Sequence, residues 1–173
     1  IIEDMTARTP QTSYGTQKVI GELLINDYSR KGFIDGRALR FPTVVVRPGK
    51  PNKAASTFAS SIIREPLQGQ TALCPVAPES KMFLASPRSI VQNIVHAHNL
   101  TANEWGFSRE TTLPGFTISI SDMAEALRVF AGNDVANLIQ WEPDPFIQEI
   151  VNGWPPEFDT RKAKDLGLSL IHI

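Results

Sequence analysis

Two residues near the start of the sequence have side chains and a spacing that could move a proton. Tyr14 and Lys18 are one helical turn apart, so a helix would place both on the same face. A free phenol has a pKa of about 10 and is a poor base near neutral pH. A lysine ammonium group beside it favours the phenolate and lowers that pKa. We therefore predict that Tyr14 acts as a general base towards a hydroxyl group and that Lys18 tunes it.

The pair needs a helix to align it. Apolar residues from Val19 to Leu24 recur with helical rather than alternating spacing. Ser13 is a suitable N-cap residue, and Gly32 suits the position after a helix C-terminus. The sequence thus predicts a helix from Ser13 to about Arg30. The same pattern also fits an amphipathic helix whose tyrosine and solvated lysine have no catalytic role.

A segment divided by a proline follows this helix. Residues 38–41 are strand-like, and 43–46 form a β-branched run typical of a buried parallel strand. Pro42 stands between them and has no amide hydrogen, so we predict that it interrupts the strand ladder. Residues 47–53 combine proline, glycine and basic side chains and are predicted to form a loop. Ligands of open α/β sheets bind at the carboxyl ends of strands, where this loop would lie.

Helices and short strands alternate along the rest of the chain. Expected strands are 72–73, 81–84, 116–120 and 138–141, and expected helices are 56–64, 86–98, 122–130, 143–151 and 159–167. Ser86, Ser121 and Asp159 are the predicted N-cap residues, and an apolar stripe runs along 86–98. The alternation predicts an α/β fold without a linker long enough to separate independent domains.

Composition limits what the chain as a whole can be. Its 173 residues are 42% hydrophobic with a net charge of −1, which suits one globular core and lacks the basic surplus of a nucleic-acid site. No apolar run approaches the roughly 20 residues of a membrane span, and the N-terminus does not resemble a signal peptide. The single cysteine, Cys74, fits a reducing cytoplasm and a buried small side chain. We expect a cytoplasmic protein that binds neither nucleic acid nor membrane.

We predict structural rather than functional roles for the histidines of 96–98, the acidic residues of 142–144 and the tryptophans. His96 and His98 diverge on a helix because they are two residues apart, so no metal site is predicted. The acidic side chains of 142–144 flank a helix start, where capping accounts for them. Core packing is expected for the three dispersed tryptophans, Trp105, Trp141 and Trp154.

Three segments in order resemble one enzyme family. Residues 10–24, PQTSYGTQKVIGELL, are similar to the active-site helix of extended short-chain dehydrogenases, which include sugar-nucleotide epimerases and dehydratases. Residues 39–49, LRFPTVVVRPG, resemble the family's strand that runs towards the nicotinamide. Residues 158–167, FDTRKAKDLG, resemble its terminal segment. Gln17 departs from the family's commoner serine or threonine before the lysine.

This resemblance implies the C-terminal part of an NAD(P)-binding Rossmann fold with a small substrate-binding region. It implies NAD as the cofactor, with Tyr14 as the base during hydride transfer. Lys18 would also donate hydrogen bonds to the nicotinamide ribose. Pro42 and Thr43 would be neighbours of the cofactor through their backbone.

The family also carries parts that this sequence lacks. Its glycine-rich pyrophosphate loop and its catalytic serine or threonine would lie upstream of Tyr14, and no such glycine fingerprint occurs here. We therefore interpret the chain as a C-terminal fragment that would bind NAD poorly and catalyse little by itself. Its expected divisions are 1–50, the Rossmann part with the active-site helix and the next strand; 51–168, mainly substrate-binding with elements that return to the Rossmann sheet; and 169–173, a tail interpreted as non-native sequence.

A homodimer is a further implication of the resemblance. The helix that starts at Tyr14 often contributes to a dimer contact in this family. Ile20, Leu24 and Tyr28 could supply the apolar face for it. Tyr28 fits the core of a single subunit equally well.

Further segments resemble a branch of the family that uses NAD to oxidise a four-carbon sugar acid beside its carboxylate. These segments are 12–29, 47–52 with 62–67, and 85–89. A sugar acid needs a cationic partner for its carboxylate, and a bidentate arginine is well suited. The expected substrate-binding residues are Arg47, Asn52, Lys53 and Arg88. A solvated basic loop, including Lys50, is an equally simple explanation for the first three, and a local ion pair for the last.

Two other functions remain open at this point. A nucleotide-sugar epimerase or dehydratase of the same superfamily would need a diphosphate-binding surface after Lys53, whereas the small basic loop favours a single carboxylate. A non-catalytic NAD-sensing protein can share the fold. Such proteins typically lose the tyrosine or the lysine, and Tyr14 and Lys18 are both present. The leading interpretation is NAD-dependent oxidation of a small 2-hydroxy sugar acid to the 2-oxo acid, as part of a longer enzyme.

Overall fold

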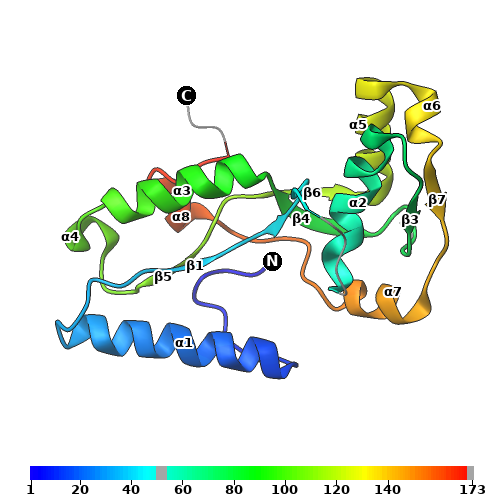
Figure 1. Cartoon of the computed structure of the whole chain (residues 1–173). Coiled ribbons are helices and arrows are strands. Elements are labelled where there is room, and N and C mark those ends of the chain that lie inside the picture. The colour runs from blue at the N-terminus through cyan, green and yellow to red at the C-terminus, as the bar shows by residue number, and fades with distance from the viewer. Residues whose placement is uncertain (50–53, 171–173) are drawn as a thin grey trace. The chain divides into compact units, whose positions relative to one another are not determined.

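The computed structural model describes residues 1–49 and 54–170 of the chain. It has the predicted α/β fold and divides into two units (Figure 1). The first unit consists of Ile1–Pro42, Arg88–Pro114 and Phe158–Ile173. The second consists of Thr43–Pro87 and Gly115–Glu157. The first unit contains one sheet and the second contains two, and their interiors differ in kind, so each unit is described by itself.

The first unit is built on two parallel strands, β1 (Ala38–Arg40) and β5 (Glu110–Thr112), with Ala38 opposite Glu110. Helix α1 (Ser13–Arg30) lies on one side of this pair, and α3 (Pro87–Asn99) and α8 (Arg161–Asp165) lie on the other (Figure 1). The four-residue helix α4 (Ala102–Trp105) follows α3. The helix that carries the candidate base is thus supported from one side by a small parallel sheet.

The second unit contains two further sheets. In the first, β4 (Lys81–Ala85) lies between β2 (Thr43–Val44), which is parallel to it, and β6 (Phe116–Ser119), which is antiparallel. In the other, β3 (Ala72–Cys74) pairs in parallel with β7 (Ile139–Trp141). The helices are η1 (Ala55–Thr57), α2 (Phe58–Arg64), η2 (Pro66–Gln68), α5 (Ile120–Ala131), α6 (Asn133–Ala136) and α7 (Pro145–Asn152).

These elements close around an apolar core. Ile62 of α2, Leu84 of β4 and Ile120 of α5 are fully buried in it. Cys74 is also fully buried, as predicted, and this burial raises the pKa of its thiol. The backbone at Gly115 passes directly over the Phe83 ring, where a Cβ atom would lie 2.6 Å from Phe83 Cζ. Glycine is therefore required there by the close approach of the chain to the ring.

Pro42 interrupts the strand, as predicted. β1 ends at Arg40 and β2 begins at Thr43, and the two strands belong to different sheets and different units. The parallel pairing predicted for the β-branched run is also confirmed, although the ladder covers only two of its residues. Val45 is buried beyond the end of the ladder and donates a backbone hydrogen bond to Ala85 O.

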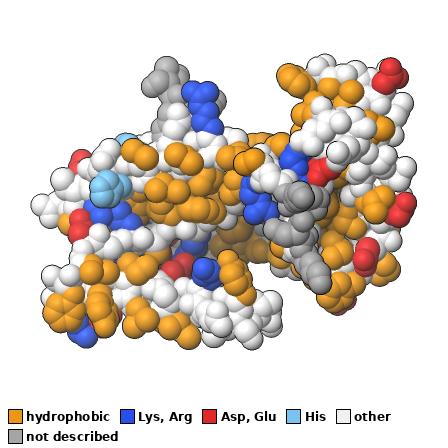
Figure 2. Space-filling view, viewed as in Figure 1, with side chains coloured by type: hydrophobic (Ala, Val, Ile, Leu, Met, Phe, Trp, Pro, Cys, Tyr) orange, Lys and Arg blue, Asp and Glu red, His pale blue; other side chains and the backbone are white. Residues whose placement is uncertain are grey.

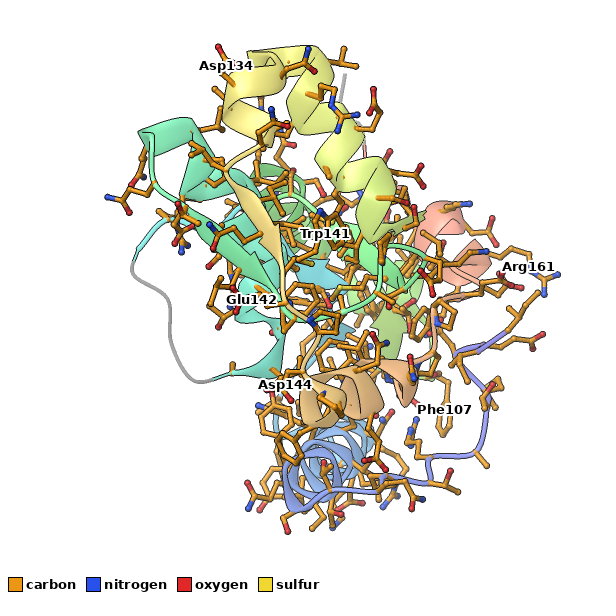
Figure 3. All side chains as sticks on the ribbon, turned by 90° about the vertical axis from the view of Figure 1, so that its right-hand side faces the viewer. Phe107, Asp134, Trp141, Glu142, Asp144 and Arg161 are labelled. Atoms are coloured by element: carbon orange, nitrogen blue, oxygen red, sulfur yellow. The ribbon has the colours of Figure 1, made fainter. Side chains whose placement is uncertain are left out.

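Three predicted helix caps are wrong by one or two residues. At α8 the N-cap residue is Thr160, not Asp159, although the Asp159 carboxylate accepts a hydrogen bond from Arg161 N. Thr12, not Ser13, caps α1, because its backbone is extended and its side chain accepts from Gly15 N. Ser119, not Ser121, caps α5 and forms a capping box with Asp122. The acidic segment before α7 behaves as expected, since the Asp144 carboxylate accepts from the first amides of that helix (Figure 3). The helices α4 and α6 were not predicted, because four residues are too few to show helical periodicity, and the polar strand β5 was not predicted either.

Much of the apolar surface of the first unit is exposed. In α3 the buried positions include Ile90 and the polar Asn93, whereas Val91, Ile94 and Val95 of the apolar stripe are exposed. Asn93 is buried because its side-chain amide exchanges two hydrogen bonds with the backbone of Ser169. Hydrophobic side chains consequently gather over α3 and along α1 (Figure 2).

The tryptophans only partly follow the expectation of core packing. Trp105 is buried and Trp154 packs against the apolar core, but Trp141, at the end of β7, is 39% exposed. The core-packing prediction is therefore wrong for Trp141, which pairs with Cys74 at the margin of its sheet. None of the helices in the described part of the chain combines the length and apolar character that a membrane span needs.

Candidate active site

The first turn of α1 carries the predicted pair. Tyr14 follows the Thr12 cap, and Lys18 lies one turn further along the same face. Lys18 Nζ lies 5.2 Å from the centroid of the Tyr14 ring, which is within the range of a cation–π contact. Both side chains are exposed, Tyr14 to 71%. The structure therefore brings the phenol and the ammonium group together and leaves both accessible.

Gly15 lets the preceding loop fold back on the start of the helix. A Cβ atom at Gly15 would lie 3.0 Å from Pro10 Cβ and 3.3 Å from Thr12 Oγ1. These distances are tighter than ordinary van der Waals contacts, so a larger residue would push away the cap that begins the helix. The residue next to the candidate base is thus small for a packing reason.

An ion-pair cluster fastens α1 to β1. Glu22, one turn beyond Lys18, accepts two hydrogen bonds from Arg40 of β1, Nε to Oε1 and Nη2 to Oε2, each 2.8 Å long. Arg8 of the N-terminal loop lies 3.1 Å from the same carboxylate. The hydrogen bonds that Arg40 donates to Glu22 raise the pKa of the Arg40 guanidinium above its ordinary value, so the pair stays charged. Bidentate pairing of this kind sets both distance and orientation.

A second polar cluster joins α1 to β5. The Asn26 side chain donates to Glu110 Oε2 at 2.6 Å and accepts from Arg109 N at 3.0 Å. Arg8 also forms an ion pair with Glu110. No residue of α1 is fully buried, so these polar contacts, rather than an apolar seam, determine how the helix with Tyr14 sits on the sheet.

The predicted cofactor neighbours lie where the two units divide. Pro42 is buried and ends the first segment of the first unit, and Thr43 is half-buried and begins β2 of the second. Their proposed backbone contacts with a cofactor stay a prediction.

The predicted substrate-binding residues are distributed over both units. Arg47 is half-buried in the second unit, where its N–H donates to Ser60 Oγ at 3.3 Å and its carbonyl accepts from Arg64 Nη1 at 2.7 Å. Arg88 is exposed in the first turn of α3, in the first unit. Asn52 and Lys53, with the neighbouring Lys50, lie outside the described residues.

The sequence analysis did not single out Arg64 and Glu65 at the end of α2. The side chains of both residues are part-buried, and Arg64 Nη2 donates to Glu65 Oε1 at 2.5 Å. The signal that could have found them is a pair of adjacent charges directly after the apolar residues Ile62 and Ile63. Charged side chains in such a place are seldom buried without a partner.

Comparison with known proteins identifies the family. No protein-family model matches the sequence. The chain is 52% identical over 167 residues to D-erythronate dehydrogenase from Cupriavidus necator, covering 96% of this chain and 52% of that protein. It is 47% identical over 169 residues to D-erythronate dehydrogenase from Haemophilus influenzae, covering 98% of this chain and 54% of that protein. The chain thus spans about half the length of these curated relatives.

A solved structure agrees with the sequence comparison. The structure described as the nucleoside-diphosphate-sugar epimerase from Agrobacterium tumefaciens matches with a TM-score of 0.93 and 45% identity, over 97% of this chain and 49% of that one. The chain belongs to the NAD-dependent epimerase/dehydratase family of extended short-chain dehydrogenases. Within that family it is similar to the D-erythronate dehydrogenases over nearly its whole length.

The residues present fit the nicotinamide cofactor of such a family. The Tyr14 hydroxyl and the Lys18 ammonium group share one exposed helix face, so both can reach a group that docks against it. An ammonium group offers three donors, enough for the hydroxyls of a ribose. Within the described ranges, no group of three histidine, cysteine or acidic side chains is placed to hold a metal ion.

Proposed function

We propose that this chain is the part of an NAD-dependent dehydrogenase that carries the general base. The whole enzyme oxidises a small 2-hydroxy sugar acid, D-erythronate or a close relative, to the 2-oxo acid. The observation that carries this proposal is the identity of about half of all residues, over nearly the whole chain, with two D-erythronate dehydrogenases. The Tyr14–Lys18 pair supplies the chemistry that such a reaction needs.

In the proposed mechanism Tyr14 holds and moves the proton. Its phenolate oxygen accepts the proton of the C2 hydroxyl while the C2–H bond breaks and the carbonyl forms. A bound NAD would supply the hydride acceptor for C2. Lys18 stabilises the phenolate through its charge and would hold the nicotinamide ribose through hydrogen bonds. Glu22 acts as a positioning residue, because its pair with Arg40 sets where α1 lies on the sheet.

The substrate carboxylate requires a cation, a role that we assign to Arg47, Lys53 and Arg88, with the neutral amide of Asn52 as a further hydrogen-bond donor. Arg47 has support from its surroundings, since its backbone is held at both N–H and carbonyl by α2. A backbone that is already held loses less conformational entropy when its side chain binds an anion. The cytoplasm is the proposed compartment, supported by the single buried thiol of Cys74.

A nucleotide-sugar epimerase is the second candidate. The description of the Agrobacterium tumefaciens structure favours it, because that chain matches this one with a TM-score of 0.93. Both candidates use a tyrosine to handle a substrate hydroxyl proton, so the Tyr14–Lys18 geometry does not separate them. The substrate does.

NADH formation by a full-length protein containing this chain tests the proposal. Short aldonates and nucleotide sugars form the panel, and D-erythronate is expected to be oxidised. Tyr14→Phe removes the base and should lower kcat by about 10²-fold to 10⁴-fold. Tyr28→Phe, at the other tyrosine of this chain, is the matched control and should keep full activity. Conversion of a nucleotide sugar with no acid oxidised would move the protein to the epimerases, and full activity of Tyr14→Phe would refute the mechanism.

We also propose that the whole enzyme is a homodimer that pairs through α1. Ile20, Leu24 and Tyr28 are each about half exposed along that helix. Leu24→Arg should convert a dimer to a monomer in sedimentation velocity, because a charge would be buried in the contact. Val129→Arg, on the exposed side of α5, is the control and should leave the oligomeric state unchanged. A dimer that survives Leu24→Arg would place the contact elsewhere.

A further inference from the structure

The two edges of the small sheet in the first unit differ. At the edge of β5 that faces away from β1, Thr112 N donates to the Asp4 carboxylate at 2.8 Å, and Glu110 O accepts from Lys162 Nζ at 2.7 Å. The backbone groups that a further strand would need are therefore already bonded to side chains of the same unit. This edge of the sheet is closed.

The edge of β1 that faces away from β5 is open. Ala38 N donates to Arg109 O and Arg40 O accepts from Leu113 N, so the backbone groups of Ala38 and Arg40 face β5. These groups alternate in direction along a strand, which points the N–H and carbonyl of Leu39 away from β5. Within the described ranges, β1 pairs with β5 and with no other strand. Leu39 thus offers a free donor and acceptor at the sheet edge.

One face of α3 in the same unit is apolar and exposed. Val91, Ile94 and Val95 are three or four residues apart, so they share a helix face, and they are 59%, 42% and 54% exposed. They contribute to the hydrophobic surface over α3 (Figure 2). Because α1 and α3 cover opposite faces of the β1–β5 pair, the pair has the layers of a larger parallel sheet (Figure 1). Sheets of this kind normally have more than two strands, and β1 offers the open side.

Proteins of this family contain enough further chain to occupy this surface. The chain spans 52% and 54% of the two D-erythronate dehydrogenases and 49% of the Agrobacterium tumefaciens structure. A full-length protein of that size therefore has a second half of about equal length. In an α/β fold that half consists of strands and helices. A strand added to a sheet edge gains main-chain hydrogen bonds, and a helix packed on an apolar face gains burial of hydrophobic surface.

We propose that the open edge of β1 and the apolar face of α3 form the docking surface for the upstream half of the full-length protein, the half that carries the family's glycine-rich loop. A parallel strand of the upstream half pairs with Leu39, and a helix of it covers Val91, Ile94 and Val95. Residues of this chain alone form the closed edge of β5 and the polar contacts of α1. The docking surface is therefore preformed, and the upstream half can bind to it as a separate chain.

Amide hydrogen exchange tests the open edge. In the full-length protein the Leu39 amide should exchange at least about 100-fold more slowly than in this chain, because it becomes part of a ladder. The Thr112 amide, bonded to Asp4 at the closed edge, is the matched control and should be protected in both. Fast exchange of Leu39 in the full-length protein would overturn the docking surface. Protection of Leu39 in this chain alone, increasing with its concentration, would assign the edge to a second copy instead.

The apolar face of α3 is tested by Ile94→Arg. A charge placed in a buried contact is costly, so the change should lower the Tm of the full-length protein by at least about 5 °C, or prevent its folding. The Tm of this chain should not change, because Ile94 is exposed in it. Val129→Arg, at an exposed apolar residue of α5, is the control and should change neither Tm. A full-length protein that tolerates Ile94→Arg would show that the upstream half does not cover this face.

Co-expression of this chain with a tagged upstream half tests whether the two halves bind without a covalent link. The unmodified chain and its Val129→Arg variant should co-purify with the tagged half, whereas Ile94→Arg should not. Protection of Leu39 in the full-length protein without co-purification would keep the docking surface and refute its independence of the link. None of these measurements uses catalysis, so a full-length protein that oxidises no sugar acid would refute the proposed function and leave the docking surface standing.

Discussion

The interiors of the two units of this chain are stabilised by different kinds of interaction. In the second unit, apolar side chains from two sheets and three helices meet in one core, with Ile62, Leu84 and Ile120 fully buried. In the first unit the buried side chains around β5 are largely polar, including Arg109, Glu110 and Thr111. The helix that carries Tyr14 and Lys18 lies on this polar surface.

This difference shows that one kind of interaction can supply most of the stability of a unit while another kind sets the position of a helix. Buried apolar area contributes most of the stabilisation of a fold and is not directional. Ion pairs add little net stability, because desolvation offsets the attraction, but their geometry fixes distances and angles. The second unit is therefore expected to be the more stable one, and the first unit the more accurately aligned one around the candidate base.

The largest expected effect comes from the core of the second unit. Ile62→Ala should lower the free energy of unfolding by about 2–5 kcal/mol, because it leaves a cavity in a closed core. Leu24→Ala, on the exposed side of α1, should change it by less than about 0.5 kcal/mol in this chain. Urea denaturation measures both. Equal effects would show that the two units do not differ in the way their interiors suggest.

A smaller effect is expected from the ion pair that positions α1. Glu22→Gln weakens the bidentate contact and leaves Arg40 with only the more distant Asp4 carboxylate, 3.9 Å away, which should cost about 1–3 kcal/mol. Hydrogen exchange in α1 should rise while that in α5 does not change. Asp27→Asn, which removes an exposed pair with Arg30 and Lys31 on the same helix, is the control and should change neither. Protection of α1 that survives Glu22→Gln would refute the positioning role.

The smallest expected effect is a pH dependence of two equivalent helix caps. A hydrogen bond from Ser119 lowers the pKa of Asp122 at the start of α5, and one from Thr101 lowers the pKa of Glu104 in α4. A lowered carboxyl pKa favours the charged form in the folded state. The stabilisation is therefore present above the unfolded-state pKa of about 4 and is lost as the pH falls through the folded-state value.

The two caps should respond unequally because α5 buries four side chains, whereas the four-residue α4 buries only Trp105. Below about pH 4, amide shifts should show that α4 frays, whereas α5 stays ordered through Met123 and Leu127. Asp122→Asn and Glu104→Gln should each remove the pH dependence of their own cap only. Fraying of α5 before α4 would contradict the comparison between the units.

Local sequence signals predicted most of the secondary structure. The helix from 13 to 30 has the predicted bounds, and Pro42 divides two strands, because periodicity and the missing proline amide act within a few residues. The errors arise where neighbouring residues offer equally good local choices. Thr12 and Ser13 are both good caps, and only the extended backbone of Thr12 decides between them. β5 was missed because its three residues, Glu110–Thr112, are polar, and their burial depends on side chains of α1, the N-terminal loop and α8.

The sequence by itself determined the chemistry of the candidate base. The spacing of Tyr14 and Lys18 is a property of one helical turn, and the family resemblance depends on residues that can be read in order. Only the tertiary structure decided which charges meet. Arg40 pairs with Glu22 from 18 residues away and Asn26 reaches Glu110 across 84 residues, distances at which no local pattern indicates a partner.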